Sequence, residues 1–125
     1  VDGSDNFETK FLINDFCLKF KKFLVTGAIS KFDGHVFTFN YKNKKQPCLR
    51  CFFQESKISD DILNCESEGI LGTVAGFVGI LQANEILKRI LGIGRSLNGY
   101  ILILDLLNLK FRKVKIKKRK DCICY

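Results

Sequence analysis

The chain has 125 residues, of which 46% are hydrophobic and 27% are charged, and its formal net charge is +8. This balance excludes a disordered chain and predicts one globular domain. The longest apolar stretch, residues 70–81, is well short of the roughly 20 residues that span a bilayer. The chain opens on a polar segment without the apolar core of a secretory signal, so we expect a cytoplasmic protein with no membrane contact.

The first third of the chain predicts a strand end, a helix and a short strand. Val1-Asp2 has the character of a last strand step, and apolar residues at helical spacing predict a helix over residues 6–20. Residues 23–26 form a β-prone apolar run of the kind that is buried in a parallel sheet. Gly27 is expected to end this strand.

The remainder predicts a mixed α/β order of elements. An Asp33-Gly34 turn precedes a strand with alternating side chains over residues 36–41, and residues 54–64 form a polar connection. The longest helix is expected over residues 70–91. Two further strands are expected, at residues 100–104 and 109–117.

Basic residues are concentrated near the end of the chain, where eight of the eleven residues from Lys110 to Lys120 are Lys or Arg. Such a run can contact phosphates. The alternation with Val114 and Ile116 favours the solvated face of a strand instead, so a nucleic-acid partner is not expected. A steep salt dependence of DNA binding would indicate the other interpretation.

Four of the six cysteines form two close pairs at distant places. Cys48 and Cys51 have C-x-x-C spacing, which lets two thiolates reach one ion, and Cys122 and Cys124 lie near the chain end. Together they could supply the four sulfurs of a structural zinc site. The alternative is that the last pair belongs to a frayed end and binds nothing.

Two cysteines stand apart from these pairs. Cys65 precedes the long helix, whose dipole favours a thiolate, while the carboxylates of Glu66 and Glu68 oppose it. Cys65 is therefore either reactive or inert. Cys17 lies among apolar neighbours on the first helix, where core packing is the expected role.

Asp2 and Asp5 bracket a Gly-Ser step between the strand end and the first helix. Nucleotides and their magnesium bind at such junctions in α/β proteins, and a carboxylate there could hold Mg²⁺ against phosphate oxygens. The alternative is that Asp5 caps the helix. His35 lies beside a turn and is expected on the surface.

Taken together, these landmarks resemble the carboxy-terminal half of the MoeB/ThiF/HesA family, the bacterial relatives of ubiquitin-activating enzymes. The order and spacing of the pieces carry the resemblance over nearly all of the chain. The pieces are Asp2-Gly3-Ser4-Asp5-Asn6-Phe7, Asn14-Asp15, Gly27-Ala28, Phe32-Asp33-Gly34, Pro47-Cys48-Leu49-Arg50-Cys51, Asn64-Cys65, Glu68-Gly69 and residues 79–88.

The resemblance implies a fold and an activity. The fold is a partial Rossmann-like, ThiF-type α/β domain over residues 1–125, with a mixed sheet, helices and a tetracysteine zinc knuckle. The activity is adenylation of the C-terminal glycine of a ubiquitin-like sulfur carrier, of the molybdopterin or thiamin type, with ATP and Mg²⁺. A homodimer is also implied, and the glycine-rich helix that follows Ile70 is a plausible place for close contact.

The same resemblance implies roles for single residues. Asp5 matches the carboxylate that binds Mg²⁺-ATP, and Asn6 is its neighbour in the nucleotide loop. Cys65 matches a cysteine that becomes covalently linked during sulfur transfer in some members. Residues 52–64 match a crossover loop above the carrier's tail. The implied zinc ligands are Cys48, Cys51, Cys122 and Cys124.

The sequence departs from the family pattern in three ways. The second cysteine pair has C-x-C rather than C-x-x-C spacing, and His35 stands where glutamine is usual. The amino-terminal half, with its glycine-rich loop and the cations that stabilise the α-phosphate, is missing, so we expect no adenylation by this chain alone. The alternative function is a non-catalytic, truncated module that keeps the zinc knuckle and binds a ubiquitin-like protein.

Overall fold

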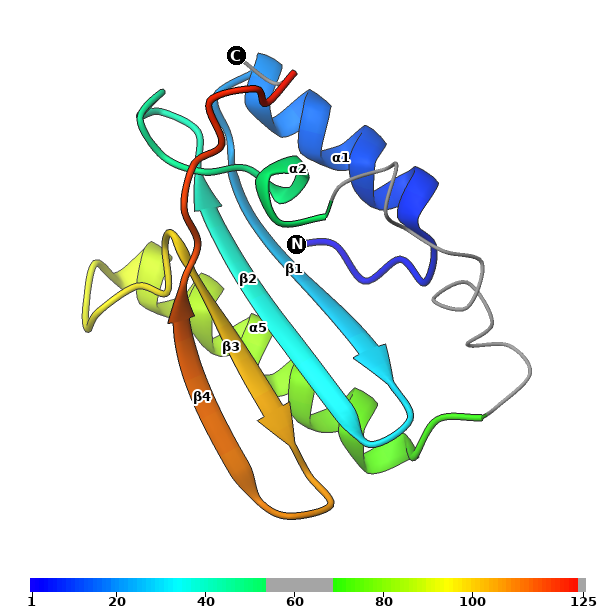
Figure 1. Ribbon diagram of the computed structural model, residues 1–125. Coiled ribbons are helices and arrows are strands. Elements are labelled where there is room, and N and C mark those ends of the chain that lie inside the picture. Colours follow the sequence, from blue (N-terminus) through cyan, green and yellow to red (C-terminus); the bar gives the residue numbers. More distant parts are fainter. Residues whose placement is uncertain (54–68, 124–125) are drawn as a thin grey trace.

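A computed structural model describes residues 1–53 and 69–123. Four antiparallel strands form one sheet in the order β1-β2-β3-β4. Helix α5 covers one face of this sheet, and α1 and α2 lie over the other (Figure 1). The elements are α1 (Phe7–Lys19), β1 (Phe23–Ser30), β2 (Asp33–Asn40), α2 (Leu49–Phe52), α5 (Gly72–Leu91), β3 (Tyr100–Asp105) and β4 (Lys110–Lys115).

The α/β class is confirmed, but the mixed sheet that the resemblance implied is corrected, because all four described strands pair in antiparallel fashion. The environment expected for β1 changes with it. β1 pairs with β2 in an antiparallel hairpin, and the parallel contacts are the single bridges Asp2↔Thr26 and Thr38↔Asn98. Parallel pairing of β1 with β2 is impossible because only two residues connect them, far fewer than a crossover needs. β1 is apolar on both sides because helices cover both faces of the sheet.

Alternation along β2 divides the core into two clusters. Val36 faces α5 and packs with Val25, Val74 and other residues of that helix layer. Phe37 and Phe39 face the opposite side, together with Leu24 and residues of α1 and α2. The predicted period of two is thus confirmed, and each face has its own helical cover.

The hairpin turn and the two predicted turn glycines lie elsewhere than expected. The turn is Lys31-Phe32, with Lys31 at a φ of 45°, so Gly27 and Gly34 lie within β1 and β2. A Cβ at Gly27 would lie 2.7 Å from a methyl of Val78, and one at Gly34 would lie 2.5 Å from the other. These glycines let α5 approach the sheet closely.

The glycines of α5 itself do not make this close approach. Among residues 1–53 and 69–123, no atom beyond the adjoining residues and the helix backbone lies within 4 Å of the Cβ position at Gly72, Gly76 or Gly79. α5 ends at Gly92, which adopts a left-handed φ of 66° and donates its N–H to Lys88 O. In the part of the chain that the structure describes, no helix combines the length and the apolarity that a membrane crossing requires.

β4 is an edge strand of the sheet, and its side chains are exposed, as expected for a solvated basic strand. It ends at Lys115, two residues earlier than predicted. Ile116 is buried and its N–H donates to Gly99 O at 2.9 Å, so the chain turns back toward the core there. His35 lies within β2 rather than beside a turn, and its partial burial lowers the pKa of its imidazole.

Candidate functional site

Three of the four predicted metal ligands come together in the fold. Sγ of Cys48 lies 3.8 Å from Sγ of Cys51 and 3.5 Å from Sγ of Cys122. All three sulfurs lie within 4.8 Å of one another, and all three residues are buried. Cys124 and the candidate nucleophile Cys65 lie outside the described residues. The structure therefore joins the two distant cysteine motifs through Cys122.

A single turn of helix sets the geometry of the C-x-x-C motif. Cys48 precedes α2 in an extended conformation, and the N–H of Cys51 donates to Cys48 O at 3.0 Å. The side chain of buried Asn14 on α1 stabilises this turn. Its Oδ1 accepts hydrogen bonds from the N–H of Leu49, at 3.0 Å, and from the hydroxyl of Tyr41, at 2.5 Å.

A second contact between α2 and α1 is the ion pair of Arg50 with Asp15. Nε and Nη2 of Arg50 donate to the two carboxylate oxygens of Asp15 at 2.9 and 2.8 Å. The guanidinium of Arg50 also lies over the ring of Phe11, 4.5 Å from its centroid. The conspicuous Asn14-Asp15 pair therefore has a structural role, because it anchors the cysteine turn to α1.

The segment after β4 brings Cys122 to this turn. Figure 1 shows it passing alongside α2 after it leaves β4. Nζ of Lys118 donates to Lys44 O at 2.5 Å, and Nη1 of Arg119 lies 3.5 Å from Arg50 O. The tail is thereby tied to α2, which carries Cys51, and to the loop that precedes it.

The donor set fits a soft metal ion. Zn–S bonds of about 2.3 Å in a tetrahedron place sulfurs about 3.8 Å apart, which is the spacing of Cys48 and Cys51. Hydrogen bonding from Cys48 lowers the pKa of the Cys51 thiol to about 5, against an opposing effect of burial. A thiolate is the form in which cysteine binds zinc.

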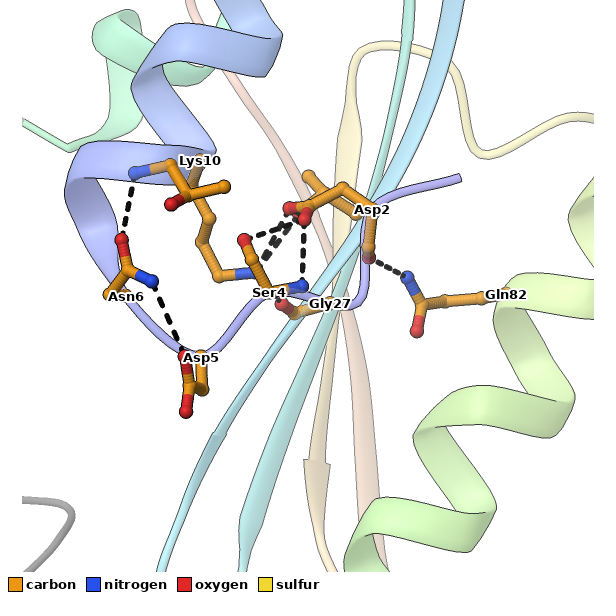
Figure 2. Close-up of polar contacts among 9 residues, drawn as sticks. Asp2, Ser4, Asp5, Asn6, Lys10, Gly27 and Gln82 are labelled. Carbon is orange, nitrogen blue, oxygen red and sulfur yellow. Dashed lines mark hydrogen bonds and ion pairs between the residues drawn. The ribbon is translucent and has the colours of Figure 1, made fainter.

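The strand-to-helix junction contains the second candidate site. Asn6, rather than Asp5, caps α1: its Oδ1 accepts from the N–H of Thr9 at 2.8 Å. Asp5 is exposed, and its carboxylate accepts a hydrogen bond from Nδ2 of Asn6 at 3.3 Å. The capping role considered for Asp5 is therefore wrong, and Figure 2 shows its carboxylate beside the side chain of Asn6.

A buried ion pair beneath this junction was not predicted from the sequence. Nζ of Lys10 lies 3.0 Å from Oδ2 of Asp2, and the two side chains are 6% and 1% exposed. One signal was present: Lys10 lies three residues after Phe7, on the apolar face of the predicted helix. A lysine at such a position needs a buried partner, and Asp2 is that partner.

Acid is expected to remove a stabilising contribution of Asp2. Burial raises the pKa of this carboxyl, but hydrogen bonds from Ser4, Thr26 and Lys10 outweigh burial and hold it below the ordinary value of 3.8. The stabilising contribution of Asp2 is therefore complete at pH values above 3.8, the ordinary pKa. It disappears as the pH falls through the lowered pKa of the folded state.

The measurement is the free energy of unfolding in urea between pH 2 and pH 6. Asp2→Asn should flatten its decline below about pH 4. Asp33→Asn, which alters an exposed carboxylate at the start of β2, should keep the decline of the parent chain. An undiminished decline in Asp2→Asn would contradict the assignment.

Comparisons with known proteins found a matching family and several relatives. The model of the ThiF family matches residues 1–124. The sulfur carrier protein adenylyltransferase of Thermus thermophilus is 39% identical over 125 residues, which are 98% of this chain and 46% of that protein. Adenylyltransferase and sulfurtransferase MOCS3 of Drosophila grimshawi is 40% identical over 123 residues, 98% of this chain and 27% of that protein.

A solved structure shares the fold at much lower identity. The crystal structure of E. coli MccB with ATP superposes with a TM-score of 0.74 at 14% identity, covering 99% of this chain and 37% of that one. The chain spans less than half the length of each of these relatives.

Proposed function

Because this chain belongs to the ThiF family, we propose that it forms the carboxy-terminal half of an adenylyltransferase domain that activates a ubiquitin-like sulfur carrier. The substrate would be the carrier's C-terminal glycine, and the reaction would use ATP and Mg²⁺. The observation that carries the proposal is the exposed carboxylate of Asp5 at the strand-to-helix junction, which accepts a hydrogen bond from its neighbour Asn6. The identity to the Thermus thermophilus adenylyltransferase supports the carrier as substrate.

The chemistry assigns a limited role to this chain. The glycine carboxylate attacks the α-phosphorus of ATP, an O–P bond forms, and the bond to pyrophosphate breaks. When bound, Mg²⁺ would neutralise charge on the phosphates. Asp5 would hold that ion through its carboxylate, and Asn6 would keep the loop in place by capping α1. These residues bind and orient the nucleotide.

The cysteine cluster supports a structural rather than a catalytic zinc. We propose Cys48, Cys51, Cys122 and Cys124 as its ligands, because all-sulfur sites leave no open position for substrate. The described sulfurs bridge α2 and the tail, so the ion would join segments that have no strand pairing between them. Cys65 is proposed as the residue that becomes covalently linked in sulfur transfer.

The remaining family features are proposals of the same kind. The outward-facing glycines Gly72, Gly76 and Gly79 leave one side of α5 open to close approach, which supports a homodimer contact there. Residues 52–64, of which 54–64 lie outside the described residues, would form the crossover loop above the carrier's tail. A cytoplasmic location is a further part of the proposal.

Carrier-dependent ATP–pyrophosphate exchange tests this function. The chain alone should give only background exchange, whereas the chain joined to the amino-terminal half of the Thermus thermophilus relative should exchange. In the joined protein, Asp5→Asn should lower the exchange rate by about 100-fold or more, the loss typical of a removed electrostatic contact to the reacting group. Asp33→Asn is the matched control.

Two results would count against the proposal. Exchange by the joined protein that is unaffected by Asp5→Asn would remove Asp5 from the site. Capture of a Gly-Gly-ended carrier by the chain, combined with no exchange in the joined protein, would instead favour the zinc-stabilised binding module.

A further inference from the structure

Every polar atom of Asp2, three positions before Asp5, takes part in a hydrogen bond. The N–H of Asp2 donates to Val25 O at 2.8 Å, and its carbonyl accepts from Nε2 of Gln82 at 2.8 Å. Its Oδ1 accepts from both the N–H and the hydroxyl of Ser4, at 2.8 and 2.6 Å. Its Oδ2 accepts from Thr26 at 2.5 Å and from Lys10. Asp2 therefore cannot shift without breaking several hydrogen bonds.

Lys10 ties this residue to the rest of the junction. Its Nζ donates to Oδ2 of Asp2 at 3.0 Å, to Gly27 O at 2.6 Å and lies 3.4 Å from the hydroxyl of Thr26. These partners use the three donors of an ammonium group. Figure 2 shows the Lys10 side chain reaching from α1 toward Asp2, while Gln82 reaches Asp2 from α5.

The energetic cost of burial indicates what this pair contributes. A buried ion pair gives little net stability relative to apolar side chains of the same volume, because both charges lose their hydration. Its hydrogen bonds are directional, however, and they determine the path of the chain from Asp2 to the start of α1. Ser4, which Asp2 holds, and Asn6, which caps α1, are the two neighbours of Asp5.

We propose that Lys10 and Asp2 are positioning residues that hold the carboxylate of Asp5 where it would bind Mg²⁺-ATP. The inference rests on the proposed function. Neither residue needs to touch the nucleotide: Lys10 neutralises and orients Asp2, Asp2 holds Ser4, and Ser4 and Asn6 together set the backbone of Asp5. The Asp5 carboxylate can then stay exposed and still be well placed.

The first test uses ATP–pyrophosphate exchange by the joined protein described above. Lys10→Met should lower kcat about 10- to 100-fold, since a displacement near 1 Å can cost that much, while KM for ATP changes less than about threefold. Lys10→Arg, which keeps the charge and donors, should recover most of the rate. Lys19→Met, at the exposed end of the same helix, is the matched control.

The second test uses amide hydrogen exchange in the 125-residue chain, and it needs no activity. The double variant Asp2→Asn/Lys10→Met leaves no uncompensated buried charge, so it should fold. The N–H of Ser4 should exchange about 10-fold faster in it, because its acceptor is weakened, while amides in the β2–β3 pairing keep their rates.

The outcomes separate the two proposals. An unchanged kcat in Lys10→Met, or equal acceleration of Ser4 and the β2–β3 amides, would overturn the positioning role and indicate a purely structural pair. If the joined protein shows no exchange at all, the proposed function fails, and the Ser4 amide still decides whether the pair orders this loop.

Discussion

Cys48→Ser is expected to abolish metal binding and to cause the largest loss of stability. Cys48 is fully buried and is the sulfur to which both Cys51 and Cys122 lie close. Its replacement removes the central ligand and detaches the tail, so most of the roughly 10 kcal/mol that a structural zinc contributes should disappear. Metal content per chain should fall from about one to near zero.

Metal analysis and urea unfolding with and without a chelator would measure both effects. Cys17→Ser is the matched control, because Cys17 is a half-buried free cysteine on α1 outside the cluster. Cys124→Ser should also lose the metal if Cys124 is the fourth ligand. Parent chain that purifies without metal, and whose unfolding does not respond to a chelator, would contradict the assignment.

Gly34→Ala is expected to lower the free energy of unfolding by about 2–3 kcal/mol, as overpacking of a core does. The new Cβ would lie 2.5 Å from a methyl of Val78 and 3.3 Å from a methyl of Leu104. Both atoms belong to the buried cluster between α5 and the sheet. The helix must therefore move outward, and its packing against β1 and β2 is weakened.

Gly76→Ala is the control, because Gly76 lies on α5, the helix that packs against Gly34, but on its exposed side. No described residue outside the adjoining backbone lies within 4 Å of its Cβ position, so in the monomer this change should raise stability by up to about 1 kcal/mol through helix propensity. Adding Val78→Ala to Gly34→Ala should recover part of the loss by removing the clashing methyl. Equal effects of Gly34→Ala and Gly76→Ala in urea unfolding would show that α5 does not pack closely at Gly34.

Local sequence patterns determined the elements of this protein. A helix predicted over residues 6–20 is observed as Phe7–Lys19, and one predicted over 70–91 is Gly72–Leu91. These elements depend on periodicity, caps and helix-ending glycines, all of which act within a few residues. The pairing of the two cysteine motifs was one of two interpretations that the sequence left open, because a C-x-C pair can also belong to a frayed end that binds nothing. The structure brings Cys122 to Cys48.

Tertiary structure alone decided which side chains these elements bring together. Gly27 and Gly34 have the local signature of a strand end and a turn, but their role comes from Val78, more than forty residues later in the chain. Lys10 similarly has a partner only because the chain start lies beside β1. Propensity and period depend on near neighbours, whereas close approach and buried charge pairing depend on residues that only the folded chain makes adjacent.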